Sequence, residues 1–228
     1  MIKRDIVTDS TGSVERMRPS LSRGIYLITP EEWPFASLRA LLAELLPLGP
    51  ALLQYRDKRS PAAERRRRAA LLSELCRAHR VPLIINDDPE LALAVGAAGA
   101  HLGRDDGSLA EARKRLGPDA ILGWSCYADL ERARRGAREG ASYLAFGSVF
   151  PSPTKPEATR APLGLLAQAK HEFALPICAI GGIGLAEART LAAIGVELVA
   201  VISAVFSAQD PIAAFLALKR AFAEAAKE

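Results

Sequence analysis

Eight short apolar runs alternate with amphipathic segments from Gly24 onward, and this repeat constrains the fold more than any other feature. The predicted strands are 24–29, 51–56, 82–87, 99–103, 120–125, 142–150, 176–182 and 197–203. The predicted helices are 36–47, 61–79, 89–97, 108–116, 129–139, 163–173, 185–194 and 210–226. Short continuous apolar strands separated by helices are typical of a parallel sheet covered by helices. With right-handed crossovers, eight such units predict an α/β fold, a single-domain (β/α)8 TIM barrel.

A doubly wound open sheet is the alternative architecture. Closure is favoured because the eight units are nearly equal and because so many predicted strands end in polar residues. In a closed barrel the carboxyl ends of all strands converge on one face, where barrel active sites lie. The catalytic barrel domain is expected to span residues 23–228. A flexible tail is expected over residues 1–22, where charged residues, Ser, Thr and Gly follow no periodicity.

Length and charge narrow the class of protein. With 228 residues, half of them hydrophobic, the chain can bury one substantial core. Its net charge of +4 suits anionic small molecules at least as well as nucleic acid. No apolar run reaches the roughly 20 residues of a membrane span, and the N-terminus lacks the apolar centre of a signal peptide. We therefore expect small-molecule substrates and no membrane partner, and a homo-oligomer is left open.

Two further features have ordinary explanations. Cys76, Cys126 and Cys178 are odd in number and widely spaced, which favours buried reduced thiols in a cytoplasmic protein. The basic run after Glu64 contains no aromatic residue, and Glu64 can pair with Arg68 one helical turn away. It therefore predicts a solvated helix face and no nucleic-acid site.

The second predicted strand ends in three long polar side chains. Gln54, Arg56 and Lys58 alternate with Tyr55 and Asp57, so the first three share one side of an extended chain. Such a row of donors predicts an anion site. An ordinary charged strand end at the surface is the alternative.

The third and fourth predicted strands end in acids. Asn86 and Asp87 follow one apolar run, and Asp105 and Asp106 follow the next. Two carboxylates from neighbouring strands, together with waters and a diphosphate, suit Mg²⁺, which takes few protein oxygens. Helix capping is the alternative for Asp106 and for Asp88, which precedes Pro89. The nearby cations favour a metal site.

The fifth and sixth units add hydroxyl groups and a lysine. Ser125 ends the fifth predicted strand, and no His–Asp partner marks it as a nucleophile, so a binding hydroxyl is expected. Ser152, Thr154 and Lys155 follow the sixth strand on a loop stiffened by three prolines. Stiffness reduces the entropy lost when a loop closes on a ligand.

The last two units suit a phosphate. Gly181 and Gly182 end the seventh predicted strand and allow backbone N–H groups to approach an anion, and Ser203 ends the eighth. The loops after these strands are the usual phosphate site of a barrel. His101, near the end of the fourth strand, is expected to pack behind the site. Two anion sites on one face predict an enzyme that joins a diphosphate-activated electrophile to a phosphorylated acceptor.

The motifs QYRDK, IINDD, HLGRDD, GWSCY, FPSPTK, AIGGI and VISAVF stand in the order found in thiamine-phosphate synthases, and the chain resembles that family from Gly24 to Asp210. The resemblance implies a (β/α)8 transferase of thiamine biosynthesis. It implies coupling of 4-amino-2-methyl-5-(hydroxymethyl)pyrimidine diphosphate to 4-methyl-5-(2-phosphoethyl)thiazole, or its carboxylated form. Thiamine phosphate and diphosphate would result from a dissociative, Mg²⁺-assisted mechanism.

The same resemblance implies residue roles. Gln54 would contact the aminopyrimidine, and Asp87 and Asp106 would bind Mg²⁺. The diphosphate ligands would be Arg56, Lys58, Asn86 and Lys155. Ser125, Ser152 and Thr154 would lie near the reacting groups. The thiazole phosphate would meet Gly181, Gly182, Ile202 and Ser203. The residues acting directly in catalysis would be Arg56, Lys58, Ser125 and Lys155.

Three positions depart from the family pattern. Tyr127 stands where many family members have histidine. In the related thiazole tautomerases that histidine is catalytic, so Tyr127 disfavours an isomerase. Trp124 is bulkier than the residue expected beside the serine, which points to altered packing of the pocket. Arg104 adds a charge beside the expected metal site. A thiazole tautomerase-like isomerase and a non-catalytic phosphate-binding barrel remain the alternatives to the synthase.

Overall fold

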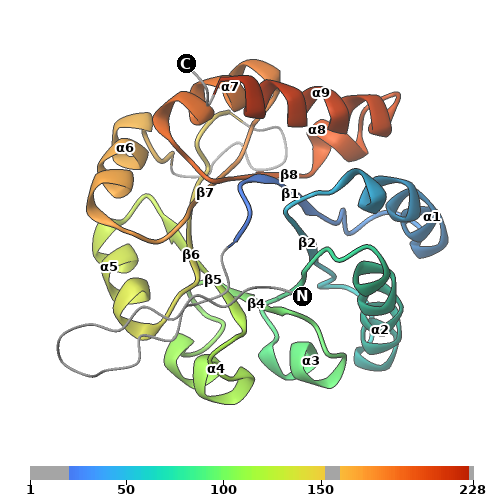
Figure 1. Cartoon of the computed structure of the whole chain (residues 1–228). Helices are drawn as coiled ribbons and strands as arrows, with labels where there is room; N and C mark the ends of the chain where they lie inside the picture. Colours follow the sequence, from blue (N-terminus) through green and yellow to red (C-terminus); the bar gives the residue numbers. More distant parts are fainter. Residues whose placement is uncertain (1–20, 152–159, 226–228) are drawn as a thin grey trace, which may run out of the picture.

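The eight apolar runs form the strands of one closed barrel in a computed structural model, which describes residues 21–151 and 160–225 (Figure 1). The strands are β1 Gly24–Ile28, β2 Leu52–Tyr55, β3 Leu83–Asn86, β4 Gly99–Leu102, β5 Ile121–Tyr127, β6 Tyr143–Phe146, β7 Ile177–Ile180 and β8 Leu198–Val201. Each is parallel to its neighbour, and β8 pairs with β1 to close the ring. The (β/α)8 prediction is confirmed, and the open-sheet alternative is wrong.

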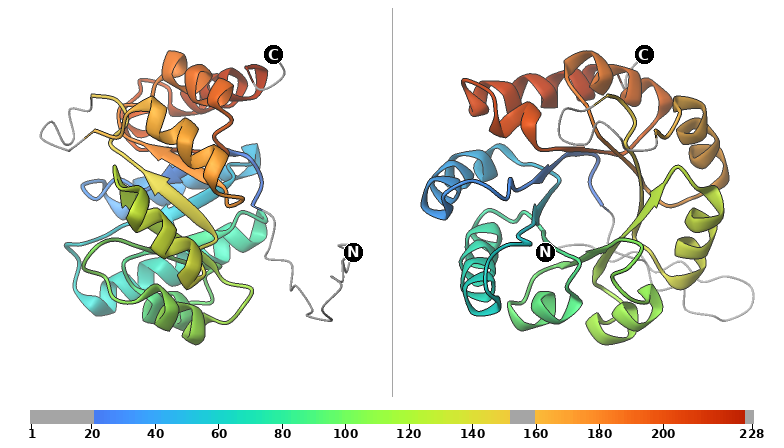
Figure 2. Two further views of the ribbon diagram at one scale, coloured as in Figure 1. Left: turned by 90° about the vertical axis from the view of Figure 1, so that its left-hand side faces the viewer. Right: turned by 180° about the vertical axis from the view of Figure 1, so that it is seen from behind.

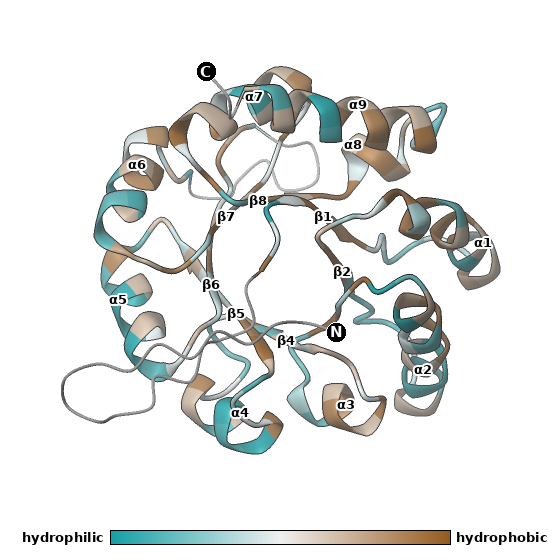
Figure 3. Ribbon diagram, viewed as in Figure 1, coloured by the Kyte–Doolittle hydropathy of each residue, from teal (hydrophilic) through white to brown (hydrophobic). Residues whose placement is uncertain are grey.

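Helices surround the barrel, as the views along and across its axis show (Figures 1 and 2). They are α1 Phe35–Leu45, α2 Ala62–Ala78, α3 Pro89–Ala94, α4 Leu109–Leu116, α5 Leu130–Glu139, α6 Leu163–Glu172, α7 Leu185–Ile194, α8 Ser203–Phe206 and α9 Pro211–Glu224, with a 3-10 turn, η1, at Leu46–Leu48. Stretches of both hydrophilic and hydrophobic residues mark α2, α4 and α5, as expected of amphipathic helices (Figure 3). The predicted tail, residues 1–22, lies almost wholly outside the described residues and stays a prediction.

Strand alternation produces two apolar layers. In β1, Ile25 and Leu27 point outward into the core between barrel and helices, whereas Tyr26 and Ile28 join a second core inside the barrel. The same alternation continues through the other strands and fixes which side chains can reach the central axis. The inward-pointing side chains are therefore the ones available to line a site on the barrel axis.

Several element ends differ from the predictions, and those of the sixth and eighth strands lie next to the carboxyl face of the barrel. The sixth strand stops at Phe146, and the next residues turn across the end of β7, where Val149 N donates to Ile180 O at 3.0 Å. The eighth strand stops at Val201, and Ser203 begins the short helix α8. Apolar residues continue past both strand ends, so hydrophobicity alone could not locate them.

Asp88 and Asp106 differ in whether they cap a helix. Asp88 caps α3 by accepting from Leu91 N at 2.9 Å, and Ser108 caps α4. Asp106 instead accepts from Gly103 N at 2.8 Å. The capping explanation is therefore confirmed for Asp88 and wrong for Asp106.

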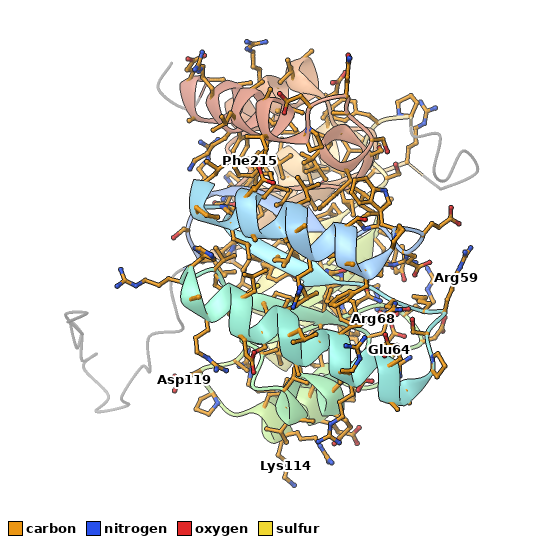
Figure 4. All side chains as sticks on the ribbon, turned by 90° about the vertical axis from the view of Figure 1, so that its right-hand side faces the viewer. Arg59, Glu64, Arg68, Lys114, Asp119 and Phe215 are labelled. Carbon is orange, nitrogen blue, oxygen red and sulfur yellow. The ribbon has the colours of Figure 1, made fainter. Side chains whose placement is uncertain are left out.

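Two further predictions concern the basic run of α2 and the three cysteines. On α2, Arg68 Nε lies 2.8 Å from Glu64 Oε1, as expected of a solvated helix face (Figure 4). All three cysteines are buried free thiols, which agrees with the prediction, while the compartment stays a prediction. Among the residues the structure describes, no helix combines the length and apolar character needed to cross a membrane.

Candidate active site

A pocket of about 680 Å³ opens where the strands end at their carboxyl side. Every predicted site residue that the structure describes lines it: Gln54, Arg56, Lys58, Asn86, Asp87, Asp106, Ser125, Gly181, Gly182, Ile202 and Ser203. Ser152, Thr154 and Lys155 lie outside the described residues. Strands separated by up to 150 residues of sequence thus deliver polar side chains to one cavity, because ring closure brings their ends together.

The end of β2 supplies two cations that already have partners. Arg56 Nη1 lies 2.6 Å from Glu31 Oε1, and Lys58 Nζ lies 2.7 Å from Asp87 Oδ2. Tyr55 and Asp57 lie on the other side of the chain, where the Tyr55 hydroxyl donates to Asp57 at 2.8 Å. An anion that enters the pocket would replace Glu31 and Asp87 as the partner of these two cations.

Asp87 and Asp106 lie within hydrogen-bonding distance of each other. Burial opposes ionisation of Asp87, but the ammonium of Lys58 and the hydrogen bond with Asp106 outweigh it and lower the pKa of Asp87. Burial and the neighbouring Asp87 raise the pKa of Asp106. The pair therefore favours a shared proton or a bound cation over two free negative charges.

This donor set fits Mg²⁺. The ion takes one or two carboxylates and completes its shell with water and substrate phosphate oxygens. Within residues 21–151 and 160–225, no group of three or more His, Cys, Asp or Glu side chains is placed to hold a metal, so a protein-saturated cage is not offered there. Two adjacent carboxylates, one resisting ionisation, form an open site of the kind that a magnesium-bound diphosphate would complete.

Below the acids, a continuous row of hydrogen bonds crosses the barrel interior. Gln54 Nε2 donates to Tyr26 Oη at 2.6 Å, and the Tyr26 and Tyr143 hydroxyls lie 2.8 Å apart. His101 Nδ1 lies 2.9 Å from Tyr143 Oη, and His101 Nε2 lies 2.8 Å from Ser125 Oγ. We call these five residues the inner chain. Burial lowers the pKa of His101 to about 4, so its ring is neutral at physiological pH.

The opposite wall, at β7 and β8, offers backbone groups. Gly181 has φ +105°, and a Cβ there would lie 2.1 Å from Ser148 Oγ, so only glycine fits. Gly182 has φ +64° and equally close backbone neighbours. Ser203 begins α8, and the first N–H groups of a helix lack partners within the helix. This wall suits a monophosphate, as the loops after the last two strands do in other barrels.

The model of the family described as thiamine monophosphate synthase matches residues 25–205. The chain belongs to the thiamine-phosphate synthase family. It is 51% identical over 201 residues to a thiamine-phosphate synthase from Azoarcus sp. (strain BH72), covering 88% of this chain and 98% of the relative. The synthase from Aromatoleum aromaticum is 50% identical over 200 residues, covering 88% and 96%. The family is one of transferases, as the motifs predicted.

A solved structure agrees with this assignment. The thiamine phosphate pyrophosphorylase from Pyrococcus furiosus is 33% identical, covers 89% of this chain and 96% of its own, and superposes with a TM-score of 0.78. At that identity, both the fold and the family are shared.

The departures from the thiamine-phosphate synthase pattern now have positions. Trp124 points outward and is 1% exposed, and its Nε1 donates to Arg132 O at 3.1 Å, so it does not line the described pocket wall. Tyr127 does line the pocket, with its hydroxyl accepting from Arg104 N at 3.2 Å. The Arg104 guanidinium lies 5.0 Å from the centre of the Tyr127 ring. These two departures therefore contact each other at the pocket rim.

Sequence reasoning missed Tyr26, which lines the pocket, and two partners of site residues, Glu31 and Tyr143. Glu31, which pairs with Arg56, lies in a loop with no motif around it. Tyr26 and Tyr143 were counted only as apolar strand residues. The available signal was a hydroxyl-bearing residue at an inward position of an otherwise aliphatic strand, because a buried tyrosine usually requires a hydrogen-bond partner.

Proposed function

We propose that this chain couples 4-amino-2-methyl-5-(hydroxymethyl)pyrimidine diphosphate with 4-methyl-5-(2-phosphoethyl)thiazole, or its carboxylated form. The products are thiamine phosphate and diphosphate, and the carboxylated form would also release its carboxyl group as carbon dioxide. The observation that carries the proposal is the single pocket with two different anion-binding walls. One wall has Lys58, Arg56 and the Asp87–Asp106 pair, and the other has the glycine turn and the start of α8.

The diphosphate belongs at the β2–β4 wall. Arg56, Lys58 and Asn86 line it, and Lys155 is added on the family resemblance because it lies outside the described residues. Each charge-assisted hydrogen bond formed there contributes roughly 1.5–3 kcal/mol. Arg56 and Lys58 exchange their carboxylate partners for phosphate oxygens, so neither cation becomes unpaired.

Mg²⁺ would be held by Asp87 and Asp106 and would neutralise charge on the leaving diphosphate. The protein groups around it hold the substrate for ionisation. Gln54 faces the pyrimidine, Ser125 offers its hydroxyl beside the reacting carbon, and Ser152 and Thr154 join them on the family resemblance. Gly181, Gly182, Ile202 and Ser203 hold the thiazole phosphate on the other wall.

The reaction is dissociative. The bond between the pyrimidine methylene carbon and the diphosphate oxygen breaks, and both electrons leave with the diphosphate. The pyrimidine amino group stabilises the resulting cation, and the thiazole nitrogen then donates its lone pair to the methylene carbon. Such a reaction depends on neutralising the leaving group and on excluding water, which a deep pocket with cations at one wall provides.

Incubation with both substrates and Mg²⁺ tests the function. We expect diphosphate release that requires both substrates, with thiamine phosphate formed in equal amount. Folded protein that binds the thiazole phosphate but releases no diphosphate would instead support a non-catalytic barrel.

A matched pair of variants tests the leaving-group wall. Lys58→Ala should lower kcat/KM about 10- to 100-fold, because one charge-assisted contact to the departing diphosphate is lost. Arg59→Ala is the control, since Arg59 is exposed and pairs with Glu32 at 2.9 Å outside the pocket. Equal activity in the two variants, measured by steady-state kinetics, would remove Lys58 from the mechanism.

A further inference from the structure

The inner chain joins two residues of the proposed substrate site that are otherwise separate. Gln54 stands at one end and Ser125 at the other, and both line the pocket. Between them, Tyr26 is 1% exposed and Tyr143 is fully buried, so little of either residue is open to bulk solvent. The Tyr143 and His101 rings also stack, with centroids 5.6 Å apart and planes at 26°.

Gly123 leaves the space through which this chain passes. In the barrel register His101 pairs with Gly123 and Gly123 pairs with Tyr143, so the histidine and the tyrosine flank β5 on both sides. A Cβ on Gly123 would lie 2.2 Å from Tyr143 Oη and 2.3 Å from His101 Nδ1. Glycine at this inward position is therefore what permits the hydrogen bond between β4 and β6.

If each tyrosine donates its proton within the chain and each link uses one proton, the protons can be ordered in two ways. Each tyrosine hydroxyl has one proton, and a neutral histidine has one N–H and one bare nitrogen. If Gln54 Nε2 donates to Tyr26, the protons of Tyr26 and Tyr143 point toward His101 Nδ1. The histidine then donates from Nε2 to Ser125 Oγ. The reverse order turns the Gln54 amide and directs the Ser125 proton at His101.

The two orders present opposite groups to the pocket. In the first, the Ser125 proton is free to donate to a ligand and Gln54 Oε1 is free to accept from one. In the second, Ser125 offers only lone pairs and the Gln54 carbonyl is occupied. An anionic oxygen accepts hydrogen bonds and cannot donate them, so an anion at Ser125 stabilises the first order.

We infer that Tyr26, Tyr143 and His101 are positioning residues that couple the two ends of the site: an anion at Ser125 fixes Gln54 to accept a hydrogen bond from a ligand amino group. The inference rests on the proposed function and adds that a diphosphate oxygen, next to the methylene carbon beside Ser125, is the anion that this hydroxyl meets. It makes the inner chain a specificity device. A 4-aminopyrimidine offers the required donor, whereas its 4-oxo counterpart presents an oxygen to the Gln54 carbonyl and is rejected.

Binding of the 4-amino and 4-oxo pyrimidine diphosphates, measured by calorimetric titration with Mg²⁺ and without thiazole phosphate, tests this coupling. Wild-type protein should prefer the amino compound. Tyr143→Phe keeps the ring but interrupts the chain, so Gln54 can turn and the preference should fall at least tenfold. Tyr55→Phe is the control, because its buried hydroxyl donates to Asp57 away from the inner chain, and it should keep the wild-type ratio. A ratio in Tyr143→Phe within twofold of wild type would overturn the inference.

A second measurement needs no substitution. ¹⁵N NMR of His101 in wild-type protein with Mg²⁺ and inorganic diphosphate should show a protonated Nε2 and an unprotonated Nδ1. The opposite tautomer would contradict the proposed order even if the tyrosine variant failed to fold. The two proposals fail separately. Wild-type protein without coupling activity removes the proposed function, whereas active protein with an unchanged preference in Tyr143→Phe removes only the coupling.

Discussion

Adjacent acids of this chain have different tasks because their surroundings differ. Asp87 and Asp88 are neighbours in sequence, yet the first lines the pocket and the second caps α3. Asp105 is exposed, while Asp106 accepts from Gly103 N and faces Asp87. Residue type alone marks all four as candidates, and only their hydrogen bonds separate a structural carboxylate from one available to a metal.

Asp106→Asn tests the proposed metal site. Removing one of the two carboxylates should raise the Mg²⁺ concentration needed for half-maximal activity about tenfold or more, because the amide no longer supplies a charged ligand. Asp105→Asn, one residue away and exposed, should leave that concentration unchanged. The measurement is a magnesium titration of diphosphate release, and an unaltered requirement in Asp106→Asn would contradict the assignment.

The pKa of Asp57 predicts how the stability of the protein depends on pH. Burial alone raises its pKa, but hydrogen bonds from Ser60, Tyr55 and Arg59 outweigh it and lower the pKa to about 2, from 3.8. A lowered pKa in the folded state stabilises the protein above pH 4, and that stabilisation is lost as the pH falls toward 2. The contribution is about 2 kcal/mol. In Asp57→Asn, the change in the free energy of unfolding between pH 4 and pH 2 should be smaller by about 2 kcal/mol. Urea titration at each pH measures it, and the m value should stay unchanged.

Elements are placed by contacts beyond their own sequence. Arg132 of α5 donates from Nε to Ser125 O at 2.6 Å and from Nη2 to Gly103 O at 2.7 Å. It also lies 4.0 Å from the centre of the Trp124 ring. One helix residue thus holds the ends of β4 and β5, and with them the backbone next to Asp106.

Replacement of this arginine should loosen both strand ends. Arg132→Met should lower the free energy of unfolding by about 2–4 kcal/mol, because two charged hydrogen bonds to buried carbonyls are lost. Arg135→Met on the same helix is the control, since Arg135 pairs only with Glu139 among the described residues and is exposed. Chemical denaturation of the two variants gives the comparison, and similar losses would argue against the role of Arg132.

Element type was predictable here, and some element ends were not. Apolar runs and amphipathic spacing identified all eight strands and one helix after each of them, but not the short helix α8. The end of β6 was missed because Val149 and Phe150 are as apolar as the strand before them. Their N–H groups donate to the carbonyls of Ile180 and Gly181, at the end of β7. The start of α8 at Ser203 was missed for the same reason, since its apolar sequence continues that of β8.

At the scale of the whole molecule, the first strand and the last helix close the barrel together. Arg23, just before β1, donates from Nε to Val196 O and from Nη1 to Phe222 O, each at 3.2 Å. Its guanidinium lies 4.0 Å from the centre of the Phe222 ring on α9. The strand pairing of β1 with β8 and this arginine join residues almost 200 positions apart.

Arg23→Ala should therefore destabilise the entire fold. We expect a loss of about 1–3 kcal/mol in the free energy of unfolding, from two hydrogen bonds and one cation–π contact. Arg220→Ala on the exposed face of α9 should change it by less than about 0.5 kcal/mol. Thermal unfolding of both variants measures the difference, and equal midpoints would show that Arg23 does not help to close the barrel.

The sequence by itself determined the number of units, the shared side of Gln54, Arg56 and Lys58, and the polar strand ends that form the pocket. Each of these depends on local spacing, which a linear pattern retains. Only the tertiary structure decided the partners of those side chains: Glu31 for Arg56, Asp87 for Lys58, and the inner chain from Gln54 to Ser125. The inner chain visits β2, β1, β6, β4 and β5 in that order, because closure of the ring brings together side chains that no sequence interval relates.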